Sequence, residues 1–149
     1  MIQADPLAHR RLLHPGLVGA GATLLIATLA SDYLYWDTLL FQYNNFSGWL
    51  LAGGLALALL AAIAFVIDLV LGRIGRVAWL RFAGLAVAAL LGVLNAFVHT
   101  RDAYTAVIPE GIVLSAVVAV LLLAVGLSGG WSLASHRAAP LPQPREAHP

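Results

Sequence analysis

The chain has 149 residues, of which 61% are hydrophobic and 10% are charged, and its formal net charge is +1. A soluble domain of this length cannot bury so many apolar side chains, so the composition predicts one integral membrane domain. The lack of cysteine excludes disulfides, thiolate catalysis, covalent c-type haem attachment and thiolate-bound metals, and no basic stripe points to a nucleic-acid partner.

Four apolar runs predict four membrane-spanning helices, at residues 15–31, 47–71, 78–98 and 107–127. A helix rises by about 1.5 Å per residue, so each run crosses or nearly crosses a hydrocarbon core of about 30 Å. We therefore expect an all-α fold in which residues 1–137 form a single four-helix transmembrane bundle. The proline-rich segment that ends the sequence cannot pack, so residues 138–149 are expected to be a disordered cytoplasmic tail.

The connections between these runs differ in composition. Residues 32–46 carry six aromatic side chains among acids and amides, which is typical of a segment at the level of the lipid headgroups. We expect an outer loop that anchors the protein at the interface, with a ligand-binding aromatic surface as the alternative. Residues 72–77, GRIGRV, predict a tight cytoplasmic turn.

The distribution of arginine predicts the orientation in the membrane. Seven of the eight basic residues lie on one side of the four runs: Arg10, Arg11, Arg73, Arg76, Arg81, Arg137 and Arg145. Arg101 is the one on the other side. Short loops rich in arginine stay in the cytoplasm, so both termini are expected to be cytoplasmic.

Small residues recur at steps of four in the third run, at Gly84, Ala88, Gly92 and Ala96. In lipid, such stripes let helix backbones approach closely, and this packing replaces the hydrophobic effect as the reason for helices to associate. We expect the stripe to pack within one bundle. Formation of a homo-oligomer through a spare stripe is the alternative.

A first polar cluster is expected at the cytoplasmic face, where His14 opens the first helix and Asp68 lies near the end of the second. An ionisable side chain inside a membrane span is costly and usually has a partner. We predict structural ion pairs among His14, Asp68 and Arg73. The alternative is a proton-relay or ligand-contacting carboxylate.

A second polar cluster is expected at the outer face. Asn95, His99 and Asp102 follow at spacings of four and three, which places them on nearly one face of the third helix. Arg101 can bond two carboxylate oxygens at once, so Asp32 or Asp102 is its expected partner. A charged cap over the bundle is the first interpretation. A small cofactor- or ligand-binding pocket formed by these five residues is the second.

Haem and metal sites find little support in the sequence. Bis-histidine ligation needs two histidines at similar depth, whereas His14 and His99 are predicted at opposite membrane faces. We therefore expect no cofactor and no metal site, with haem as the least favoured alternative. The motifs of zinc proteases, serine hydrolases and phosphate-binding loops are missing, so no catalytic residue is assigned.

Two segments carry a family resemblance. Residues 13–36 open with His14-Pro15 in the motif HP-x-x-V and end in an acid, and residues 94–130 contain N-x-x-V-H-x-R-D and a glycine-rich exit. With an acid late in the second helix, these motifs resemble a bacterial family of small predicted four-span membrane proteins of unknown function. Together with the arginine distribution, the resemblance implies a multi-pass protein of a bacterial inner membrane. Gly19 stands where many members have a second histidine, so the resemblance supports no haem or metal site.

Three functions stay open at this point. We expect a non-enzymatic membrane anchor or assembly subunit for a membrane or periplasmic complex, such as a redox complex. The alternative is a quinone-, haem- or proton-handling module built on the outer cluster. A transporter is least favoured, because four spans without an internal repeat or a broken helix make a poor monomeric transporter. The expected partners are the lipid bilayer, another membrane protein and a second copy of the chain.

Reporter fusions test the orientation. Fusions after Arg76 and after Arg137 should report from the cytoplasm, and a fusion at Gln42 should report from the periplasm, because of the arginine distribution. A periplasmic signal from the fusion at Arg137 would contradict this topology.

Overall fold

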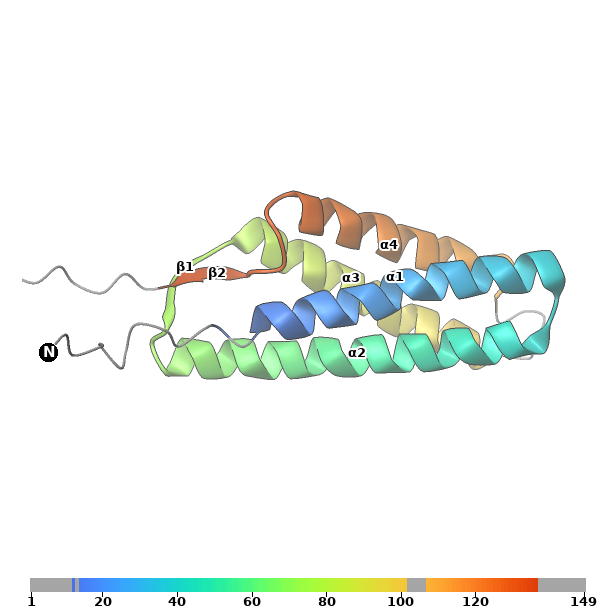
Figure 1. Cartoon of the computed structure of the whole chain (residues 1–149), viewed down its shortest axis with the longest axis horizontal. Helices are drawn as coiled ribbons and strands as arrows, with labels where there is room; N and C mark the ends of the chain where they lie inside the picture. The colour runs from blue at the N-terminus through green and yellow to red at the C-terminus, as the bar shows by residue number, and fades with distance from the viewer. Residues whose placement is uncertain (1–11, 13, 102–106, 137–149) are drawn as a thin grey trace, which may run out of the picture.

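Four long helices run side by side in the computed structural model, which describes residue 12, residues 14–101 and residues 107–136 (Figure 1). The elements are α1 (His14–Thr38), α2 (Phe41–Val70), β1 (Ile74–Val77), α3 (Trp79–His99), α4 (Glu110–Leu127) and β2 (Ala134–His136). Each helix is long and apolar enough to cross a membrane. The prediction of a four-helix membrane fold is therefore confirmed.

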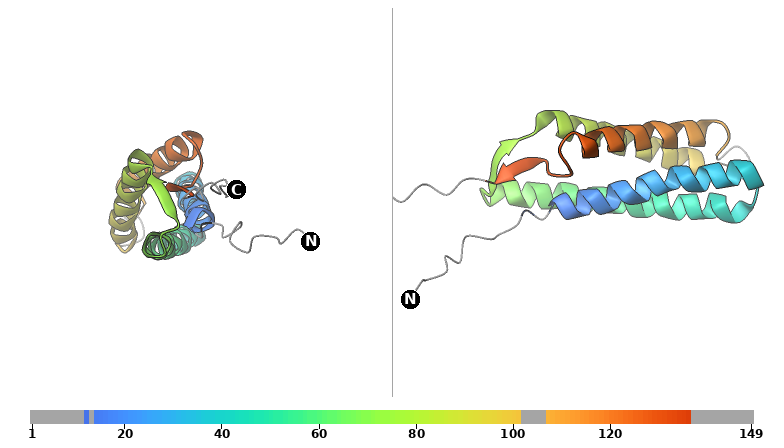
Figure 2. Two further views of the ribbon diagram at one scale, coloured as in Figure 1. Left: turned by 90° about the vertical axis from the view of Figure 1, so that its left-hand side faces the viewer. Right: turned by 45° about the horizontal axis from the view of Figure 1, so that its top comes forward.

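The helices surround a common axis in the order α1, α2, α3, α4, so that α1 packs against both α2 and α4 (Figure 2). We call one end of the bundle the arginine end; it contains the start of α1, the α2–α3 connection and both strands. The other end, with the α1–α2 connection and the end of α3, is the aromatic end. The arginine distribution predicts that the arginine end faces the cytoplasm.

The outer loop predicted at residues 32–46 is helical instead. Leu39 and Leu40 alone separate α1 from α2, and Leu39 has a φ of 54°, in the left-handed region that breaks a helix. The 30 residues of α2 would span about 45 Å, which exceeds the hydrocarbon core. The apolar run predicted at residues 47–71 therefore covers only part of a longer helix, which begins at Phe41.

The turn predicted at residues 72–77 contains a strand instead. β1 pairs antiparallel with β2, with Ile74 opposite His136 and Val77 opposite Ala134. Ile74 and Leu133 are buried in one hydrophobic cluster with residues of α1 and α2. A three-residue strand so far along the chain has no recognisable sequence pattern, so the pairing was not predictable.

The closest helix packing joins α1 to α2 through glycine. A Cβ added at Gly54 would lie 2.7 Å from Cγ of Leu25 and 3.2 Å from the carbonyl oxygen of Gly21. The stripe on α3 also faces inward, because Ala88 is buried and a Cβ at Gly92 would meet Leu55 of α2. These small residues serve packing within the bundle, and formation of a homo-oligomer stays a prediction.

Gly54→Ala should lower the free energy of unfolding by about 1–3 kcal/mol, because the added methyl group forces Leu25 and the α1 backbone to move. Unfolding in mixed micelles measures the change. Gly48→Ala is the control on the same helix, since a Cβ there meets nothing within 4 Å. Equal stability of the two variants would show that α1 and α2 are not tightly packed at Gly54.

Candidate functional site at the aromatic end

Two buried polar clusters occupy opposite ends of the bundle. At the arginine end, the structure brings together the three residues for which the sequence predicted ion pairs. Nδ1 of His14 lies 3.1 Å from Oδ2 of Asp68, and the guanidinium of Arg73 lies 3.2 Å from Oδ1. The side chains of His14 and Asp68 are fully buried, whereas that of Arg73 is 21% exposed.

Hydrogen bonding fixes the protonation of His14. The backbone N–H of Leu133 donates to Nε2 of His14 over 3.2 Å, so this nitrogen must be an acceptor. The ring proton is then on Nδ1, which donates to Asp68, and the imidazole is neutral. Arg73 therefore supplies the positive charge that balances the carboxylate. The cluster ties the start of α1 to the end of α2 and to the segment before β2.

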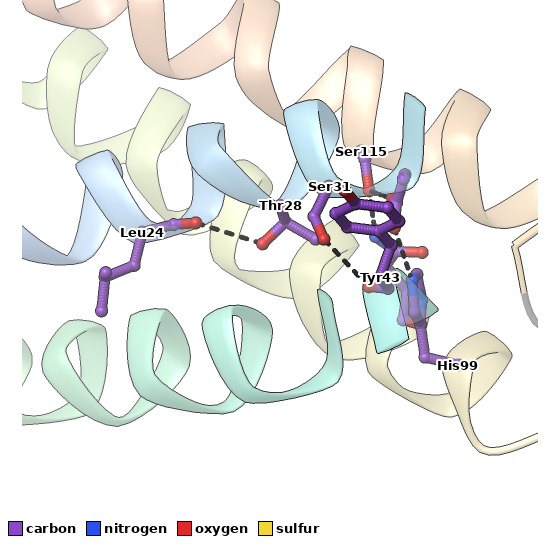
Figure 3. Close-up of polar contacts among 8 residues, drawn as sticks. Leu24, Thr28, Ser31, Tyr43, His99 and Ser115 are labelled. Atoms are coloured by element: carbon purple, nitrogen blue, oxygen red, sulfur yellow. Dashed lines mark hydrogen bonds and ion pairs between the residues drawn. The ribbon is translucent and has the colours of Figure 1, made fainter. Parts of the chain in front are cut away.

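The aromatic-end cluster consists of Asp32 on α1, Asn95 and His99 on α3, and Ser115 on α4. Nε2 of His99 lies 3.0 Å from Oδ1 of Asp32, and the hydroxyl of Ser115 donates to Oδ2. Nδ2 of Asn95 donates to Oγ of Ser115 over 2.7 Å. Figure 3 shows Ser115 and His99 on either side of this network. Side chains from three helices thus form one continuous chain of hydrogen bonds.

The hydrogen bonds of this network leave one proton to be shared. The backbone carbonyl oxygen of Asn95 can only accept a hydrogen bond, so Nδ1 of His99, 3.0 Å away, carries a hydrogen. The contact between Nε2 and Asp32 then holds one further proton, either on the imidazole as an ion pair or on the carboxyl group as a neutral pair. Both forms have zero net charge, so the pair avoids leaving an isolated charge inside the bundle.

The sequence suggested Asp32 as one partner of Arg101, but the two residues do not pair. Arg101 pairs instead with Glu110 at the start of α4, and both side chains are more than half exposed. Arg101 lies beyond the last residue of α3, whereas Asp32 is fully buried and already bonded to His99 and Ser115. An exposed pair of this kind contributes about 0–1 kcal/mol. Asp102, the other expected partner, lies outside the described residues.

Ser115 is the member of the network that sequence reasoning did not assign to the site. In the sequence it is one of three small residues at steps of four in the fourth run, Gly111, Ser115 and Ala119, a pattern that indicates helix packing. Its signal was available, because it is the one hydroxyl residue within the apolar stretch of residues 111–127. A lone serine there packs well as a small residue, so the sequence alone does not reveal its hydrogen-bonding role.

An open pocket of about 550 Å³ adjoins this network. His99 and Arg101 line it from α3, and the first turns of α2 supply Phe41, Asn44, Asn45, Gly48, Trp49 and Ala52. The Oδ1 atoms of Asn44 and Asn95 are buried and accept no hydrogen bond from the described residues. A buried acceptor without a donor costs about 1–3 kcal/mol, so a ligand that donates to it would gain affinity.

The described histidines are poorly arranged for iron. Both ring nitrogens of His14 and of His99 already take part in hydrogen bonds, so axial ligation would break one of these bonds. At Gly19, where the resembling family often has histidine, an added Cβ would lie 3.0 Å from the indole of Trp131. Within the described residues, no group of three or more histidines and acids could hold a metal ion.

The four apolar helices define a multi-pass membrane protein. Residues 10–140 match the family described as "Predicted membrane protein (DUF2231)", and the chain belongs to this family. The resemblance to predicted membrane proteins of unknown function is therefore confirmed. No curated protein and no solved structure matches the chain.

Replacement of the buried carboxylate tests the arginine-end cluster. Asp68→Asn should lower the free energy of unfolding by about 3 kcal/mol, because it leaves the charge of Arg73 without its partner. Folded yield and unfolding in mixed micelles are the measurements. Asp37→Asn, which changes an exposed carboxylate on α1, should alter neither. Unchanged stability of Asp68→Asn would show that the ion pair does not hold the helices together.

Proposed function

We propose that the protein is a small membrane subunit whose aromatic end exchanges a proton with a ligand bound in the adjoining pocket. This is the proton-handling alternative raised by the sequence. One observation carries the proposal: His99 lines the open pocket and is also hydrogen-bonded to the fully buried Asp32.

The shared proton supports this role. Histidine takes up and releases protons near neutral pH, and its partner Asp32 can hold the same proton without any change in net charge. Ser115 fixes the second oxygen of Asp32, and Asn95 fixes Ser115, so the carboxyl group is held in one orientation. A proton donor held in this way beside a pocket has the geometry required of a general acid or base.

The arrangement favours local exchange over transport across the membrane. His14 and Asp32 lie 18 residues apart on α1, a separation of about 27 Å. The buried residues of α1 between Val18 and Leu25 are apolar or glycine. A proton would have no hydrogen-bonded route along this stretch, so exchange at His99 is expected to involve one face of the membrane.

The pocket favours a planar ligand whose oxygens accept hydrogen bonds as carbonyls and donate them as hydroxyls, such as the headgroup of a quinone and its quinol. The quinol hydroxyl would donate to the unpaired Oδ1 of Asn44. Asn45 and Arg101 offer N–H donors, and Phe41 and Trp49 offer aromatic faces at the mouth. Phe41 and Trp49 are 61% and 72% exposed, at the end expected in the lipid headgroups, where a lipid-soluble ligand can enter. The ligand would exchange its proton with Nδ1 of His99, in place of the bond from Nδ1 to the backbone carbonyl oxygen of Asn95, so that the bond from Nε2 to Asp32 is kept.

The anchoring or assembly role favoured by the sequence stays a prediction. The exposed aromatic side chains at the aromatic end, among them Phe46 at 58%, could contact lipid headgroups or a partner protein equally well. The bacterial inner membrane also stays the predicted location.

Histidine signals test the proposal in a single sample. Protein labelled with nitrogen-15 histidine in a phospholipid nanodisc is titrated between about pH 5 and 8, where histidine is expected to act. The ring signals of His99 should change protonation state. His14 lies at the opposite end of the bundle and serves as the internal reference for ligand binding. Decylubiquinone should then shift the His99 signals and leave those of His14 in place.

Three variants complete this experiment. His99→Gln assigns the signals by removing them, and Arg101→Gln should weaken the binding of decylubiquinone. Asp37→Asn, an exposed change on α1, should leave both the titration and the binding unchanged. If His99 does not titrate and decylubiquinone shifts none of its signals, the pair is only a structural tie. A stoichiometric partner protein that co-purifies in mild detergent would then favour the anchoring role.

A further inference from the structure

A cavity of about 320 Å³ lies between the four helices, closer to the arginine end. This volume falls at the lower end of the range of about 300–1,000 Å³ for ligand pockets. All of its lining side chains are apolar, and alanines create much of the space: Ala58, Ala61 and Ala62 on α2, and Ala86 and Ala89 on α3. The cavity is separate from the network at the aromatic end.

The cavity opens between α2 and α3 toward the surface that faces lipid. Its inner wall is formed by buried residues such as Ala22 and Leu25 of α1, which are each 3% exposed. Val66 of α2 and Phe82 of α3 also line it, and they are 54% and 37% exposed. The space therefore extends from the interior of the bundle to the outside at membrane depth.

Hydrocarbon is the natural occupant of such a space. Apolar cavities stay dry, because water finds no hydrogen-bond partner in them. An empty cavity leaves its lining atoms without dispersion contacts on one side. The surroundings of the opening are lipid chains, so a chain that enters restores these contacts and displaces no ordered water.

Positive charge beside the cavity, at the arginine end, favours a lipid with an anionic headgroup. The connection that joins α2 to α3 at the arginine end carries Arg73 and Arg76, and Arg81 lies in the first turn of α3. Asp68 is the one acid at this end among the described residues, and Arg73 already balances it. No acid of the described segments pairs with Arg76 or Arg81, and basic pockets between membrane helices bind anionic lipid headgroups.

The two arginines also share a second pocket, of about 420 Å³, with Ser132 and Ser135. Nη1 of Arg81 donates to the carbonyl oxygens of Gly129 and Ser132, and Nη2 and Nε carry three further N–H groups. Ser132 lines this pocket, and the next residue, Leu133, lines the apolar cavity. A site for an anionic group therefore adjoins a site for a hydrocarbon chain.

We propose that one anionic phospholipid binds here, with an acyl chain in the cavity between α2 and α3 and its phosphate at Arg76 and Arg81. The proposal is independent of proton exchange at His99, because it uses the opposite end of the bundle. The bound lipid would fill the loosely packed interface between α2 and α3 and so connect these two helices.

Native mass spectrometry tests the binding. The detergent-purified full chain is titrated with phosphatidylglycerol and, separately, with phosphatidylcholine. One phosphatidylglycerol should bind with preference, and Arg76→Gln should weaken its binding about fivefold without weakening that of phosphatidylcholine. Ala86→Phe fills the cavity and should remove the bound lipid. Ala83→Phe is the matched control, because Ala83 is exposed on the same helix and does not line the cavity.

A cross-linking measurement keeps the test decisive if Ala86→Phe does not fold. Phosphatidylglycerol with a photoactivatable group in its acyl chain should label Leu85 or Ala89 of the unaltered protein. Equal binding of the two lipids, full binding by a folded Ala86→Phe variant, or labels confined to outward-facing residues would each overturn the proposal. Co-purification of an isoprenoid lipid in place of the phospholipid would also overturn it.

Discussion

The need to pair buried ionisable side chains inside the membrane organises this structure. In hydrocarbon, an unpaired ionisable side chain is so costly that its partner must come from a neighbouring helix. His14 and Asp32 are separated by five helical turns and therefore lie on one face of α1. The end of α2 supplies the partner for His14, and α3 and α4 supply those for Asp32. The position of α1 is thus fixed at both ends by hydrogen bonds.

The two histidine–aspartate pairs look alike but are electrically different. At the arginine end, Leu133 holds His14 in a neutral form, and a separate arginine balances the carboxylate. At the aromatic end, the charge balance of Asp32 depends on the one proton that it shares with His99. Removal of that proton would leave a buried negative charge, so this pair is sensitive to its surroundings in a way that the first is not. This difference is the reason that we propose proton exchange at the aromatic end and not at the arginine end.

Much of this fold was predictable because a membrane protein reports its helices through long apolar runs. The grouping of His14 with Asp68, and of Asn95 with His99, also followed from depth and helical spacing. The partner of Arg101 did not, since depth alone cannot distinguish Glu110 from Asp32. The serine that joins Asp32 to Asn95 was equally hidden, because a small residue in an apolar helix has the same sequence signal whether it packs or donates a hydrogen bond.

Uneven packing around the bundle follows from where its small residues lie. Glycines let α1 and α2 approach so closely that one added methyl group would collide with the other helix. At this point the interface between these two helices is therefore closely packed. Between α2 and α3, alanines face a space that no neighbouring side chain fills, and the seam stays open. The same kind of residue therefore closes one seam and creates a cavity in another, depending on whether a facing side chain such as Leu25 is present. Since the polar clusters lie at the ends and the cavity between them is apolar, the cavity can receive hydrocarbon without disturbing either hydrogen-bonded network.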